Sequence, residues 1–238
     1  ILCNSILLNV REIFINIFKK IVKTNSKKKE LLDDVLNNDD LKTCYKKIHS
    51  DLEIFGETKM IAILSPSDFE ISYNLARSYS KYYASLFRKT LLVNLDFNGN
   101  KKNHGKDSKV QTLVLENIGL YDIFHYENPM NCISLNQIVV PVMPNLDTIH
   151  ITTKADSIEL IKTKYFDHFI TVCKDKYKHI IFVLPPMNNS KEILLLKKYL
   201  TGAIVVCESS VSKKKDIYET VTILKDREIK NTVLVLVK

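Results

Sequence analysis

Short apolar runs, rich in isoleucine, valine and leucine, alternate along this chain with longer segments of helical periodicity. Because these runs are apolar at nearly every position, they indicate strands that are buried on both faces, as in parallel sheets covered by helices. The sequence therefore predicts a doubly wound, mainly parallel α/β sheet with helices on both faces. The expected strands lie near residues 60–65, 90–95, 146–152, 179–184, 203–208 and 232–237, and the expected helices near 73–87, 120–126, 157–174, 191–200 and 212–225.

The N-terminal segment differs from this pattern. It reads ILCNSILLNVREIFINIFKKIVK, and its asparagines, Arg11 and Glu12 argue against a membrane span. Its apolar residues recur at helical spacing, which predicts an amphipathic helix over residues 1–23 that either docks on protein or lies on a membrane surface. We therefore expect an N-terminal helix and linker in residues 1–42 and one α/β domain in residues 43–238. The chain starts without methionine, so we expect a fragment.

Charge and cysteine content limit the function classes. The net charge is +8 and comes almost entirely from lysine, which fits either an anionic partner or simply a lysine-rich soluble surface. Five scattered cysteines form no C-x-x-C pair and have no histidine at zinc spacing, which predicts a reduced, cytoplasmic protein without a structural metal site. The six histidines likewise show no metal-ligand spacing.

Glycine is scarce where a nucleotide site would need it. The stretch ILSPSDFEISYNLARSYSKYY, residues 63–83, joins an expected strand to an expected helix, yet neither glycine nor lysine lies between Ser65 and Asn74. A phosphate cradle depends on glycines that let backbone N–H groups approach the phosphates, and on a lysine that reaches them. This turn therefore has the position of a phosphate-binding loop without its residues.

Several short motifs follow in order along the chain. They are SPSDFEISYNLA at residues 65–76, LLVNLD at 91–96, GLYDIF at 119–124, NLDTIHI at 145–151 and YKHIIFVLPPM at 177–187. Together they resemble the bacterial tyrosine kinase family of capsule and exopolysaccharide synthesis, a branch of the ParA- and MinD-like P-loop ATPases. The resemblance runs from about Thr43 to the C-terminus and implies a P-loop NTPase-like fold.

The departures from the family pattern concern its chemistry. The family's S-P-x-P-G-E-G-K-S-T loop is about four residues longer, and Asp68 falls near its lysine, with Glu70 close behind. Asn94 replaces the first aspartate of L-L-I-D-x-D, while Asp96 keeps the second. Val183 replaces the magnesium-organising aspartate before the paired prolines and offers no oxygen to a cation. The resemblance thus implies a vestigial nucleotide site without catalytic residues, metal or cofactor, at Ser65, Asp68, Glu70, Asn94, Asp96 and Val183.

A helix before the first strand assembles the family's rings through E-x-x-R-x-x-R. Here the sequence TCYKKIHSDLEIF puts Thr43 at the glutamate and Lys46 and His49 at the arginines, and these cannot make the bidentate contact that arginine makes. Lys46 and His49 are therefore candidates for an oligomer or partner surface, with a solvated helix face as the alternative. The oligomeric state stays open.

The function that follows is a catalytically inactive relative of bacterial tyrosine kinases that serves as a protein-interaction or regulatory platform in capsule or exopolysaccharide synthesis. Its expected partner is a protein, either a membrane adaptor or an active kinase homologue, at the inner face of the cell membrane, and no specific nucleic acid is expected. Two alternatives stay open. One is a divergent but active ATP-binding kinase or ATPase that uses magnesium, and the other is a basic protein that binds a membrane surface through residues 1–23.

Overall fold

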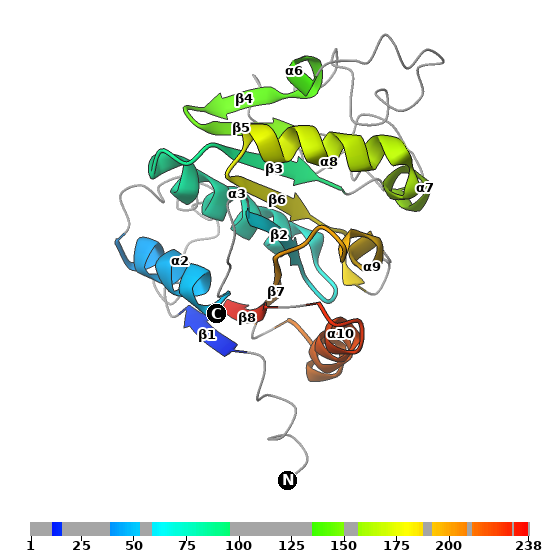
Figure 1. Ribbon diagram of the computed structural model, residues 1–238. Coiled ribbons are helices and arrows are strands. Elements are labelled where there is room, and N and C mark those ends of the chain that lie inside the picture. The colour runs from blue at the N-terminus through cyan, green and yellow to red at the C-terminus, as the bar shows by residue number, and fades with distance from the viewer. Residues whose placement is uncertain are drawn as a thin grey trace.

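A computed structural model describes residues 11–15, 39–52, 59–95, 135–149, 157–187, 192–208, 211–229 and 231–237 of the 238-residue chain (Figure 1). These residues form an eight-stranded sheet in the order β1-β8-β7-β2-β6-β3-β5-β4. Every neighbouring pair is parallel except β4 and β5, which are antiparallel. The strands are β1 (Arg11–Ile15), β2 (Lys59–Leu64), β3 (Thr90–Asn94), β4 (Val140–Met143), β5 (Leu146–Ile149), β6 (His179–Val183), β7 (Gly202–Glu208) and β8 (Thr232–Val237).

Helices cover both faces of this sheet (Figure 1). On one face, α2 and α3 pack on one set of alternate strand residues, and on the other face α7, α8, α9 and α10 pack on the other set. The predicted doubly wound α/β architecture is thus confirmed, with two apolar layers on either side of the sheet. The helices are α2 (Asp39–Asp51), α3 (Phe69–Ser85), α6 (Leu135–Ile138), α7 (Ser157–Lys162), α8 (Lys164–Lys176), α9 (Glu192–Leu196) and α10 (Lys214–Asp226).

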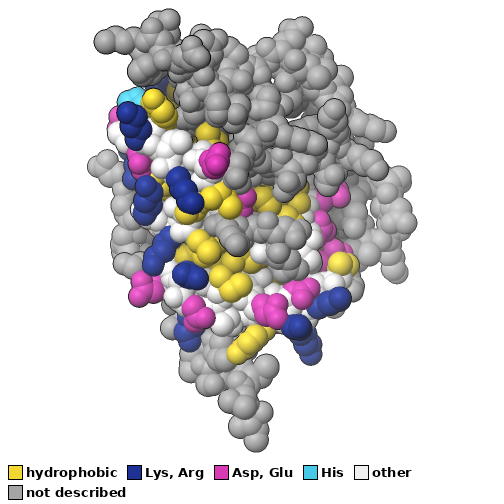
Figure 2. Space-filling view, turned by 90° about the vertical axis from the view of Figure 1, so that its right-hand side faces the viewer, with side chains coloured by type: hydrophobic (Ala, Val, Ile, Leu, Met, Phe, Trp, Pro, Cys, Tyr) yellow, Lys and Arg dark blue, Asp and Glu magenta, His cyan; other side chains and the backbone are white. Residues whose placement is uncertain are grey.

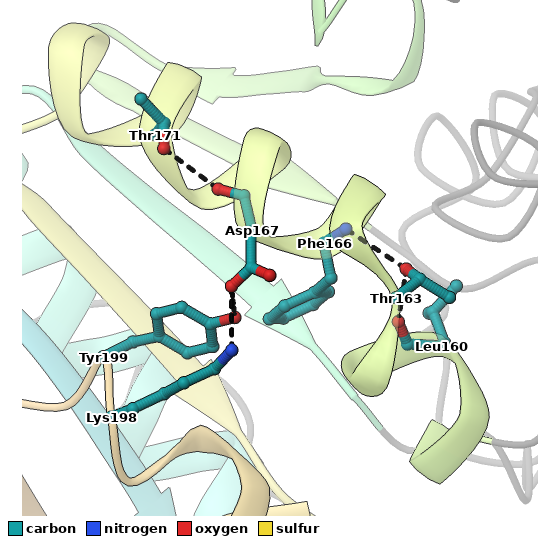
Figure 3. A network of polar contacts seen from close by, with 7 residues as sticks. All are labelled: Leu160, Thr163, Phe166, Asp167, Thr171, Lys198 and Tyr199. Atoms are coloured by element: carbon teal, nitrogen blue, oxygen red, sulfur yellow. Dashed lines mark hydrogen bonds and ion pairs between the residues drawn. The ribbon is translucent and has the colours of Figure 1, made fainter. Parts of the chain in front are cut away.

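The predicted helix over 157–174 is interrupted at Thr163, where α7 ends and α8 begins. The Thr163 hydroxyl donates to the Leu160 carbonyl at 2.8 Å and accepts from the Phe166 N–H at 3.2 Å, so one side chain closes the first helix and caps the second (Figure 3). Threonine favours such caps because its oxygen satisfies an N–H that has no partner within the helix. The apolar periodicity continues through the cap, which is why the sequence predicted one helix.

Asp167 on α8 connects this layer to the end of α9 (Figure 3). Its carboxylate accepts hydrogen bonds from Lys198 Nζ, at 2.8 Å, and from the Tyr199 hydroxyl. Hydrogen bonds from these two groups lower the pKa of Asp167. Because Asp167 and Lys198 are both exposed, this network adds little to stability. Its effect is to position the start of α8 against the residues that follow α9.

Two edge strands were not expected. The predicted amphipathic helix is wrong for Arg11–Ile15, which forms β1 and pairs in parallel with β8. The remainder of residues 1–23 lies outside the described residues. Strand β4 contains Pro141, a residue confined to sheet edges because it lacks an N–H, and the short VPVM run did not stand out as a strand. Both segments form strands because they pair with a neighbouring strand in the folded sheet, since neither has the long apolar run of the central strands.

Other boundaries differ by a few residues. Helix α3 begins at Phe69, before the predicted start, because Asp68 caps it, and α9 covers only Glu192–Leu196. The helix predicted at 120–126 lies outside the described residues. Within the described part of the chain, no helix is both long enough and apolar enough to span a membrane.

Candidate functional site

The carboxyl ends of three central parallel strands meet where nucleotide-binding α/β folds place their ligands. Val183, at the end of β6, lies in register with Ile63 of β2 on one side and with Asn94 of β3 on the other. Residues 65–68 join β2 to α3 at this edge. The structure therefore brings Ser65, Asp68, Asn94 and Val183 to one edge of the sheet.

The connection at 65–68 is closed by its own side chains. The buried Ser65 hydroxyl accepts from the backbone N–H groups of Ser67, at 3.4 Å, and Asp68, at 3.2 Å. The Asp68 carboxylate in turn caps α3 by accepting from the Glu70 N–H at 2.9 Å. A phosphate bound at a helix N-terminus needs such N–H groups as its donors. Here these donors already have partners within the protein.

The side-chain charges at the start of α3 are negative, like the charge of a phosphate. The half-buried Asp68 and the exposed Glu70 place two carboxylates at the N-terminus of α3. Anionic side chains interact favourably with the helix dipole at that end, so the two residues stabilise α3. The same charges repel a phosphate group, because like charges a few ångströms apart interact unfavourably.

The strand ends beside this turn offer little to a cation. Val183 is fully buried in the apolar layer beneath α2 and α3, and Asn94 lies on the same side of the sheet and is 8% exposed. A neutral amide and an aliphatic side chain cannot replace the paired carboxylates that organise magnesium. Asp96, the remaining predicted acidic residue, lies outside the described residues. Among the residues described, no group of three or more His, Cys, Asp or Glu could hold a metal ion.

The segment after β6 closes the edge further. The Leu184 N–H donates to the Ile63 carbonyl at 3.0 Å, and the Met187 N–H donates to the Ser65 carbonyl at 3.0 Å. The paired prolines between them thus run across the end of β2. Figure 2 views the molecule from this side and shows hydrophobic side chains gathered between charged ones on the part of the face that the structure describes.

The two candidates on α2 have different surroundings. Lys46 is exposed. His49 is half-buried, accepts from Lys59 Nζ through Nε2 at 2.8 Å, and packs against Tyr83 with ring centroids 5.2 Å apart. Burial, together with the nearby Lys59 and Arg88 cations, lowers the pKa of His49 to about 4. His49 thus contributes to the interior, and Lys46 is the more accessible of the pair.

One polar cluster was missed by the sequence reasoning. His179 begins β6, is 1% exposed, and lies beside His49 and Tyr83 at the opposite, amino edge of the sheet. Burial and the neighbouring Arg88 lower its pKa to about 3. The available signal was a histidine at the start of a strand that is otherwise wholly apolar. Tyr79, Tyr82 and Tyr83 of α3 pack in the core here.

Comparison with solved structures gives the fold. The VpsO kinase domain is 16% identical with a TM-score of 0.66, covering 82% of this chain and 89% of that domain. The kinase domain of the Escherichia coli tyrosine kinase ETK is 14% identical with a TM-score of 0.65, covering 86% of this chain and 76% of that one. This chain has the bacterial tyrosine kinase fold.

The same fold extends to P-loop ATPases. The MinD cell division protein of Aquifex aeolicus is 16% identical with a TM-score of 0.54, over 76% of this chain and 70% of MinD. The structural neighbours are thus bacterial tyrosine kinase domains and a MinD ATPase, the same groups of proteins that the sequence motifs resemble. No family model and no curated protein matches the sequence. At these identities the likeness concerns the fold, and the chemistry must be argued from the site.

Proposed function

We propose that this chain is a catalytically inactive relative of the bacterial tyrosine kinases, with a degenerate phosphate-binding loop, that acts as a protein-interaction or regulatory platform in capsule or exopolysaccharide synthesis. One observation carries the proposal. In the connection between β2 and α3, Asp68 caps the helix whose N-terminus would otherwise receive phosphates. The Ser65 hydroxyl occupies two further N–H groups of the same turn.

Phosphoryl transfer depends on positioning and on neutralising the phosphate charge. A lysine, a set of free N–H donors and a pair of magnesium-binding carboxylates supply both in an active site of this type. At the described positions, this chain has Asp68 for the lysine, Asn94 for one aspartate and Val183 for another. Retaining a packed fold while losing the site is physically consistent, because core packing and site chemistry make separate demands on the sequence.

The decisive test is calorimetric titration of the purified chain with ATP and with ADP, each with magnesium. The E. coli ETK kinase domain serves as the control for active material. We expect no saturable heat from this chain, and no phosphotyrosine after incubation with ATP. Saturable binding, or autophosphorylation, would support the divergent active kinase or ATPase instead.

A protein-interaction platform requires an exposed surface that a partner can bind. Helix α2 presents the exposed Lys46 at a position where the family's ring contact has an arginine. Lys46→Glu should weaken association with an acidic protein partner, such as a membrane adaptor or an active kinase homologue, if α2 forms the contact. Lys47→Glu is the matched control, since Lys47 is also exposed and changes the charge equally. Equal effects of the two substitutions would remove α2 from the proposal.

A further inference from the structure

The amino edge of the sheet carries an exposed apolar tip. Helix α3 ends at Ser85, and the turn that follows exposes 45% of Leu86 and 89% of Phe87. The Phe87 backbone has a φ of 57°, in the left-handed region where glycine is normally found after a helix. Its N–H donates to the Ala84 carbonyl at 3.0 Å, which holds the turn in this shape. An exposed aromatic ring at a conformationally costly position contributes nothing to the core, which suggests a contact outside the chain.

Basic residues lie at the same edge of the sheet as this tip. Arg88 and Lys89 follow Phe87 directly, Lys178 precedes β6, and Lys59 begins β2. Backbone hydrogen bonds tie these starts together, because the Lys59 N–H donates to the Lys178 carbonyl at 2.9 Å and the Lys178 N–H to the Lys89 carbonyl at 2.8 Å. Because β2, β3 and β6 run parallel, their starts lie at the same edge of the sheet. The four cations therefore lie along this amino edge. They form, with Leu86 and Phe87, what we call the amino-edge patch.

The patch is not neutralised by the described residues. Burial and then the nearby Arg88 cation lower the pKa of both Lys59 and His179, so positive charge is concentrated at this edge. Arg88, Lys89 and Lys178 are exposed and form no ion pair with a carboxylate in the described part of the chain. Among the described residues, the patch thus combines positive charge that no carboxylate pairs with and an exposed apolar ring at its tip.

We propose that the amino-edge patch docks on membranes that contain anionic phospholipids, with Phe87 entering the interfacial region and Arg88, Lys89 and Lys178 facing the head groups. Charge complementarity selects an anionic surface, and the exposed ring favours lipid over nucleic acid, since a ring at the apex of a turn gains most from entering an apolar medium. The site differs from residues 1–23, part of which forms β1. It is independent of nucleotide binding, since the patch lies at the opposite edge of the sheet from residues 65–68.

The test is flotation of the full chain with vesicles of phosphatidylcholine alone and of phosphatidylcholine with phosphatidylserine. We expect binding only to the second kind, decreasing with salt. Arg88→Gln with Lys89→Gln should weaken binding by about fivefold for each charge removed. Phe87→Gly should weaken it about tenfold. Glycine also suits the positive φ, so this variant should melt no lower than the parent, and a loss of binding cannot be attributed to unfolding.

Matched variants on α10 and at its N-cap, Lys213, provide the control. Tyr218→Ser removes an exposed aromatic ring, and Lys213→Gln with Lys214→Gln removes two exposed charges. These should leave flotation unchanged. The proposal is overturned if the chain ignores anionic vesicles, or if the α10 variants lose as much binding as the patch variants. It is also overturned if Phe87→Gly binds vesicles normally while the charge variants lose both vesicles and a duplex DNA probe, because that result indicates a nucleic-acid surface.

Discussion

His179 stacks on Tyr83, with ring centroids 4.3 Å apart and planes inclined by 24°. Neither ring nitrogen of His179 has a hydrogen-bond partner among the described residues. The imidazole therefore packs as a flat, neutral ring between β6 and α3, and its nitrogens make no hydrogen bond to the described residues. Burial disfavours its protonation, and so do the neighbouring Arg88, His49 and Lys59.

This arrangement predicts a loss of stability in acid. The pKa of His179 is about 3 in the folded chain and about 6.5 when unfolded, so the unfolded chain binds more protons between these values. The contribution of neutral His179 to the unfolding free energy is complete above about pH 6.5. It decreases as the pH falls toward 3, by at most about 1.4 kcal/mol per pH unit. We expect His179→Phe to flatten the fall in unfolding free energy between neutral pH and acid, measured by urea denaturation at several pH values.

Two controls accompany that measurement. His168 on α8 is exposed, so His168→Gln should leave the pH dependence as it is in the parent. His49, with a pKa of about 4, titrates in the same direction and keeps part of the slope in the His179→Phe variant. Identical slopes for the parent and His179→Phe would show that folding does not lower the pKa of His179.

The Asp68 cap predicts a defined cost at the start of α3. Asp68→Ala removes the acceptor for the Glu70 N–H and should lower the unfolding free energy by about 1 kcal/mol. Asp68→Ser should recover most of this loss, because serine is also a good N-cap residue. Ser67→Ala is the control, since its exposed side chain is not the cap. An unchanged denaturation midpoint in Asp68→Ala would mean that the cap does not form in solution.

A buried hydroxyl pair links α2 to α3. The Tyr45 hydroxyl donates to Ser78 Oγ at 2.6 Å, and both side chains are about 1% exposed. Ser78→Ala leaves the phenol buried without this partner and should cost about 1–3 kcal/mol. In the double variant Tyr45→Phe/Ser78→Ala the loss should be smaller than the sum of the two single losses. Strict additivity in urea denaturation would contradict a direct hydrogen bond.

Gly202 predicts a steric requirement at the start of β7. A Cβ there would lie 2.9 Å from the Asn231 carbonyl oxygen and 3.1 Å from Leu52 Cδ2. The carbonyl belongs to the backbone that pairs with Ala203, so it cannot move without disturbing the β7–β8 pairing. We expect Gly202→Ala to lower the unfolding free energy by about 1–3 kcal/mol, measured by thermal or urea denaturation. A variant as stable as the parent would show that this corner relaxes easily.

The central strands and the helices that cover them were predictable because burial on both faces requires apolar residues at nearly every position. Strands β2, β3, β6, β7 and β8 satisfy this condition, and their order along the chain gave the α/β class. Edge strands are not under that requirement. This is why β4, with Pro141, was missed and why the residues of β1 suggested a helix.

The candidate site shows the same division. The sequence by itself determined that residues 65–74 contain neither glycine nor lysine, and that an amide and a valine stand where carboxylates were expected, because these are facts of side-chain identity. Only the tertiary structure decided that Asp68 caps α3, that His49 packs inward against Tyr83, and that the start of β6 brings Lys178 to the turn that holds Arg88 and Lys89. Hydrogen-bond partners and surface neighbours depend on which strands lie side by side, and that order is set by packing between residues far apart in the chain.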